Sequence, residues 1–439
     1  MGRDKIYEKD FGYDCLKPIV DWNLRHSYRR YEVTCSENVP TDGALIFAPN
    51  HTNTLMDALV MLRANKGTTV FGARADLFNN PFIGKIMTFV RILPMVRQRD
   101  GLRNVLKNHE TQETIVETLE NGVGFCIFPE GRHRPEKSLL PLGKGVFRAA
   151  LAANEKFGEK MPVYIVPVGI EYGDFFRYRS TALVTYGKAI NVTEFVRNDA
   201  SENEAQTIDR LRKELTVRIS ELFSYIPDGE NLKEKWVLTK MLSTASGKKQ
   251  YGDFGTSLQK GMHHNREIIA GIEEKCASRP EEMKDLLDEV AKFEKYRRKD
   301  GISIYSFRKG NTVLNNVGKG FAALVGLPYF IFSSIASLPL WMIYFILQKS
   351  IKDKAFHNTM GFGVKLAGGI IFSIVYMILA FCLAPWWIAL PVFLLTIPSY
   401  SYFFDYIEGC RRWFSDIKVH KCKKLRKSFK NITKQYFNL

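Results

Sequence analysis

The sequence predicts an α/β domain, followed by a helical segment and a C-terminal transmembrane region. Three observations lead to this prediction. Short β-rich runs alternate with helical runs over residues 31–225, as in an α/β domain. Residues 226–310 are charged, with apolar residues at helical spacing. Residues 311–439 contain apolar stretches long enough to cross a bilayer and end in a basic tail.

The first part of the chain, residues 1–30, is expected to form an amphipathic helical segment. Its apolar Leu16, Ile19 and Trp22 are interspersed with lysine and arginine side chains. A helix of this composition suits a membrane interface and equally suits the surface of its own domain, so both interpretations stay open.

The α/β domain is predicted over residues 31–225. The expected strands are 44–48, 70–71, 123–128, 164–168 and 183–186. The expected helices, each with apolar residues three and four positions apart, are 55–65, 101–120, 145–157 and 205–223.

Residues 226–310 are predicted to form an accessory helical segment. One helix is expected to begin near Ser278, because Pro280 suits a first helical turn. Its apolar stripe consists of Met283, Leu286, Leu287, Val290 and Phe293. The adjacent His263 and His264 lack neighbouring ligands, so no metal site is predicted there.

The C-terminal part, residues 311–439, is predicted to be integral to a membrane. Its apolar stretches are 321–347, 361–384 and 386–404. Only Ala384 and Pro385 separate the last two stretches, which indicates a tight hairpin, and the remaining flanks are basic. Because basic flanks favour the cytoplasmic side, an even number of crossings is expected. Pro328 and Pro339 interrupt the first stretch, so we predict two crossings by the hairpin and a broken or re-entrant first stretch.

The chain is strongly basic, with a formal net charge of +17. Residues 406–439 hold ten lysines and arginines against Glu408 and Asp416, which gives this tail a net charge of +8. Such a charge suits nucleic acid, an acidic membrane surface or a phosphorylated substrate. Beside a membrane span, a basic tail usually acts as a topology signal and a contact for anionic lipids.

His51 and Asp57 are the candidate catalytic residues. Residues 44–51 indicate a buried strand that runs into a turn, followed by a helix from about Leu55. If His51 precedes this helix and Asp57 lies in its first turn, the carboxylate can orient one imidazole nitrogen and leave the other to accept a proton. The spacing from Thr54 to Asp57 also fits a capping box, in which the acid only caps the helix. Spacing alone leaves both interpretations open.

The turn after the strand at 124–128 is the second candidate site. It brings together a carboxylate, a glycine amide and two guanidinium groups, those of Glu130, Gly131, Arg132 and Arg134. Arginine side chains and backbone N–H groups together can hold a phosphate. A basic turn of this kind is also common as plain solvated surface.

These segments resemble the glycerophospholipid acyltransferase family, typified by lysophosphatidate and glycerol-3-phosphate acyltransferases. Four blocks match in order over roughly residues 28–195. They are Asn50-His51 to Asp57, Ile92-Leu-Pro-Met-Val-Arg97, Phe128-Pro-Glu-Gly131 and Ile165-Val-Pro-Val-Gly169. The resemblance implies a mixed sheet flanked by helices, as in glycerolipid acyltransferases.

Two departures from the family pattern affect the interpretation. Most members have four residues between the histidine and the aspartate, whereas this chain has five between His51 and Asp57. The longer spacing is associated with the glycerol-3-phosphate or dihydroxyacetone-phosphate branch. The family's arginine after the third block is replaced by His133, and Arg132 and Arg134 lie on either side of it.

The resemblance implies an O-acyltransferase of phosphatidate and phospholipid synthesis. It would move a fatty acyl group from acyl-CoA or acyl carrier protein to glycerol-3-phosphate or 1-acylglycerol-3-phosphate. His51 would deprotonate the acceptor hydroxyl, Asp57 would orient His51, and a backbone amide near His51 would stabilise the oxyanion. The residues implied in substrate binding are Arg97, Glu130, Gly131, Arg132 and Arg134.

No cofactor or metal is implied beyond the acyl donor itself. The implied partners are the lipid membrane, the glycerol-phosphate acceptor and the thioester donor, without nucleic acid. The catalytic domain is expected on the cytoplasmic face. Two other functions fit the same sequence: a transacylase acting between phospholipids and lysophospholipids, and a non-enzymatic, basic, membrane-anchored binding module.

Overall fold

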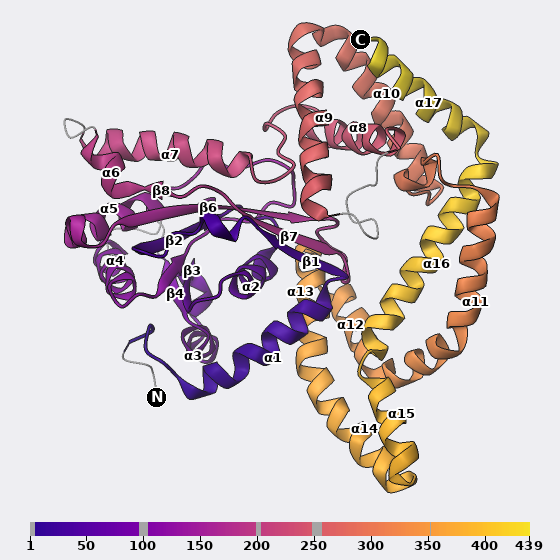
Figure 1. The fold of residues 1–439 in the computed structure, drawn as a ribbon, viewed down its shortest axis with the longest axis horizontal. Coiled ribbons are helices and arrows are strands. Elements are labelled where there is room, and N and C mark those ends of the chain that lie inside the picture. The colour runs from indigo at the N-terminus through magenta and orange to yellow at the C-terminus, as the bar shows by residue number, and fades with distance from the viewer. Residues whose placement is uncertain (1–4, 96–103, 199–202, 248–256, 352) are drawn as a thin grey trace. The chain divides into compact units, whose positions relative to one another are not determined.

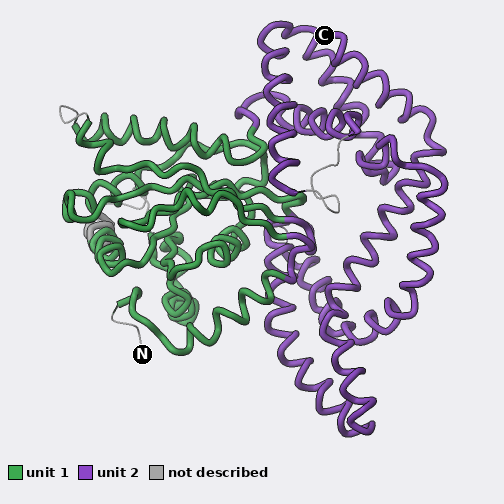
Figure 2. The backbone as a smooth tube through the Cα atoms, viewed as in Figure 1, with its two compact units in different colours: residues 1–25, 31–175, 182–225 green, residues 26–30, 176–181, 226–439 purple. Residues whose placement is uncertain are grey.

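The computed structural model describes residues 5–95, 104–198, 203–247, 257–351 and 353–439 (Figure 1). The chain divides into two compact units, drawn in different colours in Figure 2. Unit 1 comprises residues 1–25, 31–175 and 182–225, and unit 2 comprises residues 26–30, 176–181 and 226–439.

Unit 1 is built on a mixed eight-stranded sheet. The strand order is β1-β7-β6-β2-β5-β3-β4, and β8 pairs with β6. The strands are β1 (Arg30–Thr34), β2 (Ala44–Pro49), β3 (Thr69–Arg74), β4 (Ile92–Met95), β5 (Gly124–Cys126), β6 (Val163–Tyr172), β7 (Thr181–Tyr186) and β8 (Ile190–Asn191). Strands β6, β2, β5, β3 and β4 run parallel, whereas β7 and β8 are antiparallel to β6. The predicted α/β class with a mixed sheet is confirmed.

The helices of unit 1 are α1 (Phe11–Ser27), α2 (Thr54–Ala64), α3 (Pro81–Phe89), α4 (Asn104–Glu120), α5 (Gly145–Phe157), α6 (Val192–Arg197) and α7 (Glu204–Ser220). The apolar faces of α4, α5 and α7 share one core with the strands. Ile46 and Ala48 of β2 point into this core, whereas Phe47 lies on the other face beside Tyr186. Alternation along β2 therefore buries both faces of the central sheet.

Helix α1 buries one face and exposes apolar residues on another. Tyr13 and Leu24 are buried, and the guanidinium of Arg91 lies 4.7 Å from the centre of the Tyr13 ring. Phe11 and Trp22 remain exposed. The helix therefore packs on its own domain and still presents apolar side chains to its surroundings.

The accessory segment of unit 2 folds into α8 (Leu232–Ala245), α9 (Leu258–Ser278) and α10 (Pro280–Lys299). All five apolar residues of the predicted stripe on α10 are buried, and Pro280 occupies its first turn. They share a core with the C-terminal helix α17 (Lys423–Asn438). Residues 226–310 thus pack with the end of the chain.

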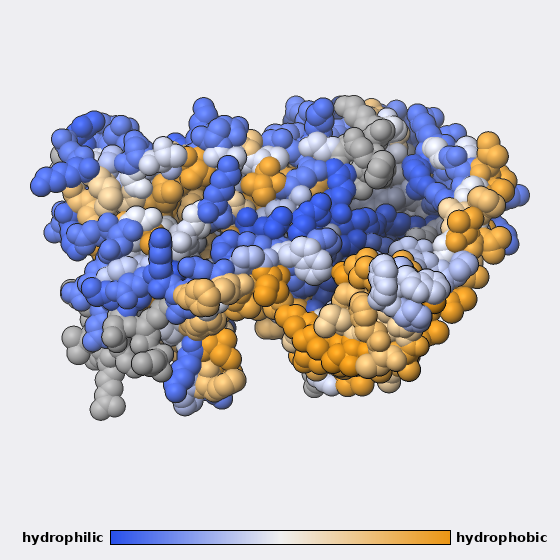
Figure 3. Space-filling view, turned by 60° about the horizontal axis from the view of Figure 1, so that its bottom comes forward, coloured by the Kyte–Doolittle hydropathy of each residue, from blue (hydrophilic) through white to orange (hydrophobic). Residues whose placement is uncertain are grey.

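The apolar helices of unit 2 are α11 (Val313–Ala336), α12 (Leu338–Ser350), α13 (His357–Gly363), α14 (Gly369–Leu383), α15 (Trp386–Thr396) and α16 (Ser399–Lys421). Within the described residues, the helices at Val313–Ala336 and Lys354–Leu383 are long and apolar enough to cross a membrane. Helices α15 and α16, bent by 52°, make a third candidate if they act as one span. Figure 3 shows the apolar surface gathered on the part of unit 2 that α14 and α15 form.

The interruption expected in the first apolar stretch falls at Ser337. Pro328 lies inside α11, whereas Pro339 lies in the first turn of α12. In Figure 1 the chain turns back at this point. The N–H that Pro339 lacks would have no partner inside the helix at a first-turn position. The break between α11 and α12 therefore costs no intrahelical hydrogen bond at this proline.

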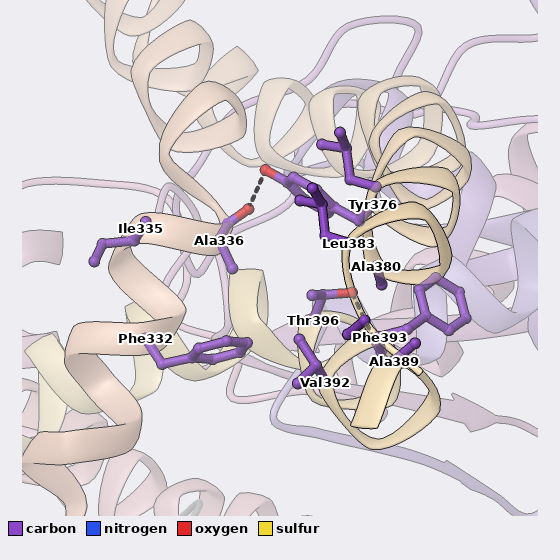
Figure 4. A pocket seen from close by; sticks show the side chains of 12 residues that line it. Phe332, Ile335, Ala336, Tyr376, Ala380, Leu383, Ala389, Val392, Phe393 and Thr396 are labelled. Carbon is purple, nitrogen blue, oxygen red and sulfur yellow. Dashed lines mark hydrogen bonds between the residues drawn. The ribbon is translucent and has the colours of Figure 1, made fainter. Parts of the chain in front are cut away.

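A cavity of about 360 Å³ lies among α11, α14 and α15 (Figure 4). Its lining is almost wholly apolar. The hydroxyl of Tyr376 donates to the carbonyl of Ala336 at 2.6 Å, and that of Thr396 donates to the carbonyl of Phe393 at 2.7 Å. Because both hydroxyls donate to backbone carbonyls, the cavity presents an apolar surface and no reactive group.

Candidate active site

The sheet brings three segments of unit 1 to one edge. Strands β5 and β6 flank β2, and all three run parallel. His51 follows β2, Glu130 follows β5, and Tyr172 ends β6. Because the carboxyl ends of parallel strands meet at the same edge of a sheet, these residues converge, and such edges commonly hold ligand sites.

His51 and Asp57 form a hydrogen-bonded pair at this edge. Nδ1 of His51 lies 2.8 Å from Oδ2 of Asp57. The aspartate side chain is fully buried, whereas 17% of the histidine side chain is exposed. Among the described residues no hydrogen bond engages Nε2 of His51. With Nδ1–H donating to the carboxylate, Nε2 carries the lone pair and can accept a proton.

Asp57 is held by four hydrogen bonds, including the one to His51. The backbone N–H groups of Thr52 and Asn53 both donate to Oδ2 at 2.7 Å. The hydroxyl of Tyr172 donates to Oδ1 at 2.7 Å. Hydrogen bonds of this kind compensate the burial of a carboxylate.

The capping interpretation and the catalytic one turn out to be compatible. Helix α2 begins at Thr54, and its N-cap residue Asn53 makes no capping hydrogen bond with its side chain. Asp57 accepts instead from the N–H groups that precede the helix. One carboxylate therefore stabilises the helix start and also orients the imidazole of His51.

The turn between β2 and α2 is fixed at both ends. The side chain of Asn50 donates to the carbonyl of Ile170 at 3.1 Å and accepts from its N–H at 2.6 Å. Thr54 adopts a positive φ of 44°, which is uncommon for a β-branched residue. A costly backbone geometry at this position suits a turn that is held for function.

Glu130 braces the turn from the side of β5. Its Oε1 accepts from the N–H of His51 at 2.7 Å, and its Oε2 accepts from the N–H of Leu140 at 2.8 Å. Burial raises the pKa of Glu130 to about 7, although these two backbone hydrogen bonds oppose the shift. Glu130 therefore joins the segment after β2 to the loop that follows β5.

The loop after β5 packs around His51. The ring of Phe128 stacks on that of His51 with the ring centres 4.3 Å apart, and His133 lies edge-on at 5.8 Å. The N–H of Arg134 donates to the carbonyl of His51 at 3.0 Å. The two rings thus pack against the imidazole, and the Arg134 hydrogen bond holds the backbone of His51.

The two arginines of this loop differ in environment. Arg132 is exposed. Arg134 is half-buried, binds Ser138, and lies 3.4 Å from the carboxylate of Glu136. Gly131 between them and Glu130 has a φ of +65°, a conformation that suits glycine. Arg97, which the sequence also placed in substrate binding, lies outside the described residues.

A buried ion pair anchors the same loop to β6. Nζ of Lys137 lies 2.9 Å from Oε1 of Glu171, and both side chains are almost completely buried. Glu171 also accepts from the N–H and the hydroxyl of Ser224, each at 2.8 Å. Glu171 directly precedes Tyr172 on β6. The residue that anchors the loop and the residue that binds Asp57 are therefore neighbours on the same strand.

The backbone amides next to His51 are already engaged. The N–H of His51 binds Glu130, and those of Thr52 and Asn53 bind Asp57. An oxyanion donor is therefore expected from another segment. Among the described residues, no group of three or more His, Cys, Asp or Glu side chains is arranged to hold a metal ion.

Sequence reasoning missed Tyr172 and Phe128 as parts of the site. Tyr172 lies 115 positions from Asp57 and meets it only through the pairing of β2 with β6. A tyrosine at the end of the strand that carries the fourth block was a usable signal. Phe128 was visible as the first residue of the third block.

Known proteins resemble this chain over part of its length. The family model described as acyltransferase matches residues 30–171. Over 127 residues the chain is 30% identical to glycerol-3-phosphate O-acyltransferase 2 of Saccharomyces cerevisiae. This alignment spans 29% of the chain and only 17% of the yeast protein.

The crystal structure of the 1-acyl-sn-glycerophosphate (LPA) acyltransferase PlsC from Thermotoga maritima also matches, with 18% identity and a TM-score of 0.35. That match covers 49% of this chain and 83% of the other. The match of the acyltransferase model spans β1 to β6 and includes His51, Asp57 and Glu130. The segment that resembles known acyltransferases is therefore the one that holds the candidate site.

Proposed function

We propose that this protein is a membrane-bound O-acyltransferase of phosphatidate and phospholipid synthesis. It moves a fatty acyl group from a thioester donor, acyl-CoA or acyl carrier protein, to glycerol-3-phosphate or 1-acylglycerol-3-phosphate. The observation that carries this proposal is the buried, four-fold hydrogen-bonded Asp57 at 2.8 Å from Nδ1 of a partly exposed His51.

The proposed reaction is direct transfer, with His51 as general base. Nε2 takes the proton from the acceptor hydroxyl, and the oxygen attacks the thioester carbonyl carbon. The C–S bond breaks, an ester forms, and the thiolate leaves with a proton that His51 can return. Asp57 holds the imidazole and stabilises the imidazolium that forms in between. No protein nucleophile or cofactor is needed.

The acceptor phosphate is expected at the loop after β5. Arg132 presents an exposed guanidinium on this loop, and two residues later the N–H of Arg134 donates to the carbonyl of His51. Guanidinium groups pair well with phosphate oxygens. Glu130, with both oxygens on backbone N–H groups, is better suited to holding this loop than to binding phosphate.

Glycerol-3-phosphate is the acceptor we favour. The five-residue spacing between His51 and Asp57 points to that branch, and the yeast relative is named a glycerol-3-phosphate O-acyltransferase. The candidate membrane helices among the described residues, two or up to three, support a site at a bilayer. The basic flanks of the apolar stretches favour a catalytic domain on the cytoplasmic face.

The test is acyl transfer by the full chain in membranes, with glycerol-3-phosphate and 1-acylglycerol-3-phosphate as acceptors and acyl-CoA and acyl carrier protein as donors. His51→Ala should lower the rate by roughly 10²-fold or more, as expected on loss of a general base. His263→Ala, an exposed histidine on α9, is the matched control and should keep the rate. Full activity of the His51→Ala protein at equal expression would refute the mechanism. Transfer from phospholipid without either thioester would point to a transacylase instead.

A further inference from the structure

Two short segments of unit 2, residues 26–30 and 176–181, bring arginines to helix α16. Nε of Arg179 lies 3.1 Å from both carboxylate oxygens of Asp405, and Nη2 of Arg179 also binds Asp405. Nη1 of Arg179 donates to the carbonyls of His26 and Tyr28 at 2.6 and 3.1 Å. Nε of Arg29 lies 3.5 Å from Oδ1 of Asp405.

Glu408, one turn further along α16, gathers three more arginines. Nη1 of Arg177 lies 2.6 Å from Oε1 of Glu408. Nε of Arg412 donates to the same oxygen at 2.8 Å, and Nη1 of Arg411 lies 4.0 Å from Oε2. The arginine cluster, as we call it, thus consists of Arg29, Arg177, Arg179, Arg411 and Arg412.

The arginine cluster has an excess of positive charge. Five guanidinium groups face the two carboxylates of Asp405 and Glu408, which leaves a formal charge of +3. Burial lowers the pKa of Arg29, and the positive charge of Arg412 lowers it further, which Asp405 and Glu408 only partly offset. An anion would relieve this imbalance of charge.

The arginine cluster borders the apolar helices of the same unit. Tyr178, between Arg177 and Arg179, packs in a buried cluster with Leu340 of α12 and Tyr400 of α16. Its ring centre lies 5.2 Å from that of Phe404, the residue before Asp405. Helix α16 therefore changes from aromatic to charged within one turn. A boundary of this kind matches the headgroup level of a bilayer, where aromatic and basic residues gather.

We propose that the arginine cluster binds the phosphate headgroup of an anionic phospholipid. A lipid is favoured over free phosphate because the neighbouring helices expose many apolar side chains, including Leu338, Met342 and Ile343 of α12, for its acyl chains. This site consists only of residues of unit 2 and includes neither His51 nor Asp57. It does not depend on the proposed acyl transfer.

The experiment uses the full chain carrying His51→Ala, so that turnover plays no part. The protein in detergent micelles is titrated with dioleoyl phosphatidylglycerol, with dioleoyl phosphatidylcholine and with inorganic phosphate, and binding is followed by melting temperature and native mass spectrometry. Arg411→Gln/Arg412→Gln should weaken phosphatidylglycerol binding roughly tenfold or more, since each basic contact near a surface contributes about 1 kcal/mol. Arg426→Gln/Lys427→Gln removes the same charge from exposed positions on α17 and should leave binding within about twofold.

Three outcomes would overturn the proposal. Equal losses in the two double variants would mean that the tail attracts anions only by its general charge, and no loss in either would place the lipid elsewhere. Stabilisation by inorganic phosphate as strong as by phosphatidylglycerol would exclude a lipid site. If the first double variant melts early without lipid, Arg411→Gln alone serves, because that side chain is 74% exposed and touches Glu408 only at 4.0 Å.

Discussion

His51, Asp57 and Glu130 form a site that is held mainly by backbone amides. Three consecutive N–H groups, those of residues 51 to 53, donate to the two carboxylates. Backbone donors have no side-chain rotamers to lose, so these hydrogen bonds require only the rotamers of the two carboxylates to be fixed. The side chain that completes this arrangement is Tyr172, and it allows a direct test.

Tyr172→Phe removes the hydroxyl that donates to Oδ1 of Asp57 and changes little else. One oxygen of a fully buried carboxylate then loses its partner, which should lower the free energy of unfolding by about 1–3 kcal/mol. We also expect slower acyl transfer, because Asp57 is freer to leave His51. Melting temperature and initial rate measure the two effects. Tyr164→Phe near the start of the same strand is the control, because it removes a hydroxyl that donates to Asp42 at 3.3 Å, away from Asp57. A variant of Tyr172 that matches wild type in both measurements would contradict this role.

Glu130 should make stability depend on pH. Its pKa is about 7 in the folded protein against 4.5 without burial, so the folded chain holds a proton between these values that the unfolded chain releases. The stability from that proton is fully present below pH 4.5 and is lost as the pH rises through 7. Glu130→Gln cannot titrate and should lack this loss.

The readout for Glu130 is the difference in melting temperature between wild type and Glu130→Gln, followed from below pH 4.5 to above pH 7. As the pH rises over this range, the melting temperature of Glu130→Gln is expected to increase relative to that of wild type. A constant offset is expected in addition, because the amide NH₂ of glutamine opposes one of the two backbone N–H groups. Parallel curves would contradict the raised pKa.

At the scale of elements, the loop after β5 depends on its attachment to β6. Lys137→Met leaves the carboxylate of Glu171 buried without its cation, which should cost about 3–5 kcal/mol. Thermal unfolding measures the loss, and Lys144→Met, an exposed lysine of the same loop, should change it little. Adding Glu171→Gln to Lys137→Met should recover part of the stability. A Lys137→Met protein as stable as wild type would mean that the pair does not anchor the loop.

The elements themselves were largely predictable, and their pairing was not. Runs such as 44–48 and 145–157 have enough apolar residues at a clear period to mark β2 and α5. Strands β4 and β8, with four and two residues, are too short to show a period. The sheet order depends on contacts between distant segments, which no local pattern encodes. His51 and Asp57 were therefore visible in the sequence, whereas the approach of Tyr172 was not.

At the scale of the whole molecule, the orientation in the membrane stays a prediction, and cysteine labelling tests it. Two crossings by the hairpin of residues 361–404 would place Cys15 and Cys422 on the cytoplasmic side and residue 384 on the other. In chains with all other cysteines replaced by serine, a membrane-impermeant thiol reagent should label Ala384→Cys from the opposite side to Cys15 and Cys422. Labelling of Cys422 together with Ala384→Cys would refute two crossings.

The interleaving of the two units was beyond what the sequence predicts. Composition changes near residues 225 and 310 are visible because charge and apolar content shift there. Nothing in composition sets residues 26–30 and 176–181 apart, although both belong to unit 2. Their assignment follows from partners such as Asp405, which lie far along the chain.

The ion pair between Arg179 and Asp405 joins residues 226 positions apart and has a consequence for biosynthesis. At about 5–20 residues per second, Asp405 leaves the ribosome roughly 10 to 45 seconds after Arg179. During that interval β1 and β7 can pair, but residues 26–30 and 176–181, which lead into these strands, still lack their contacts with helix α16. A nascent chain released before α16 is made would expose these segments, and quality control could recognise such a product by them.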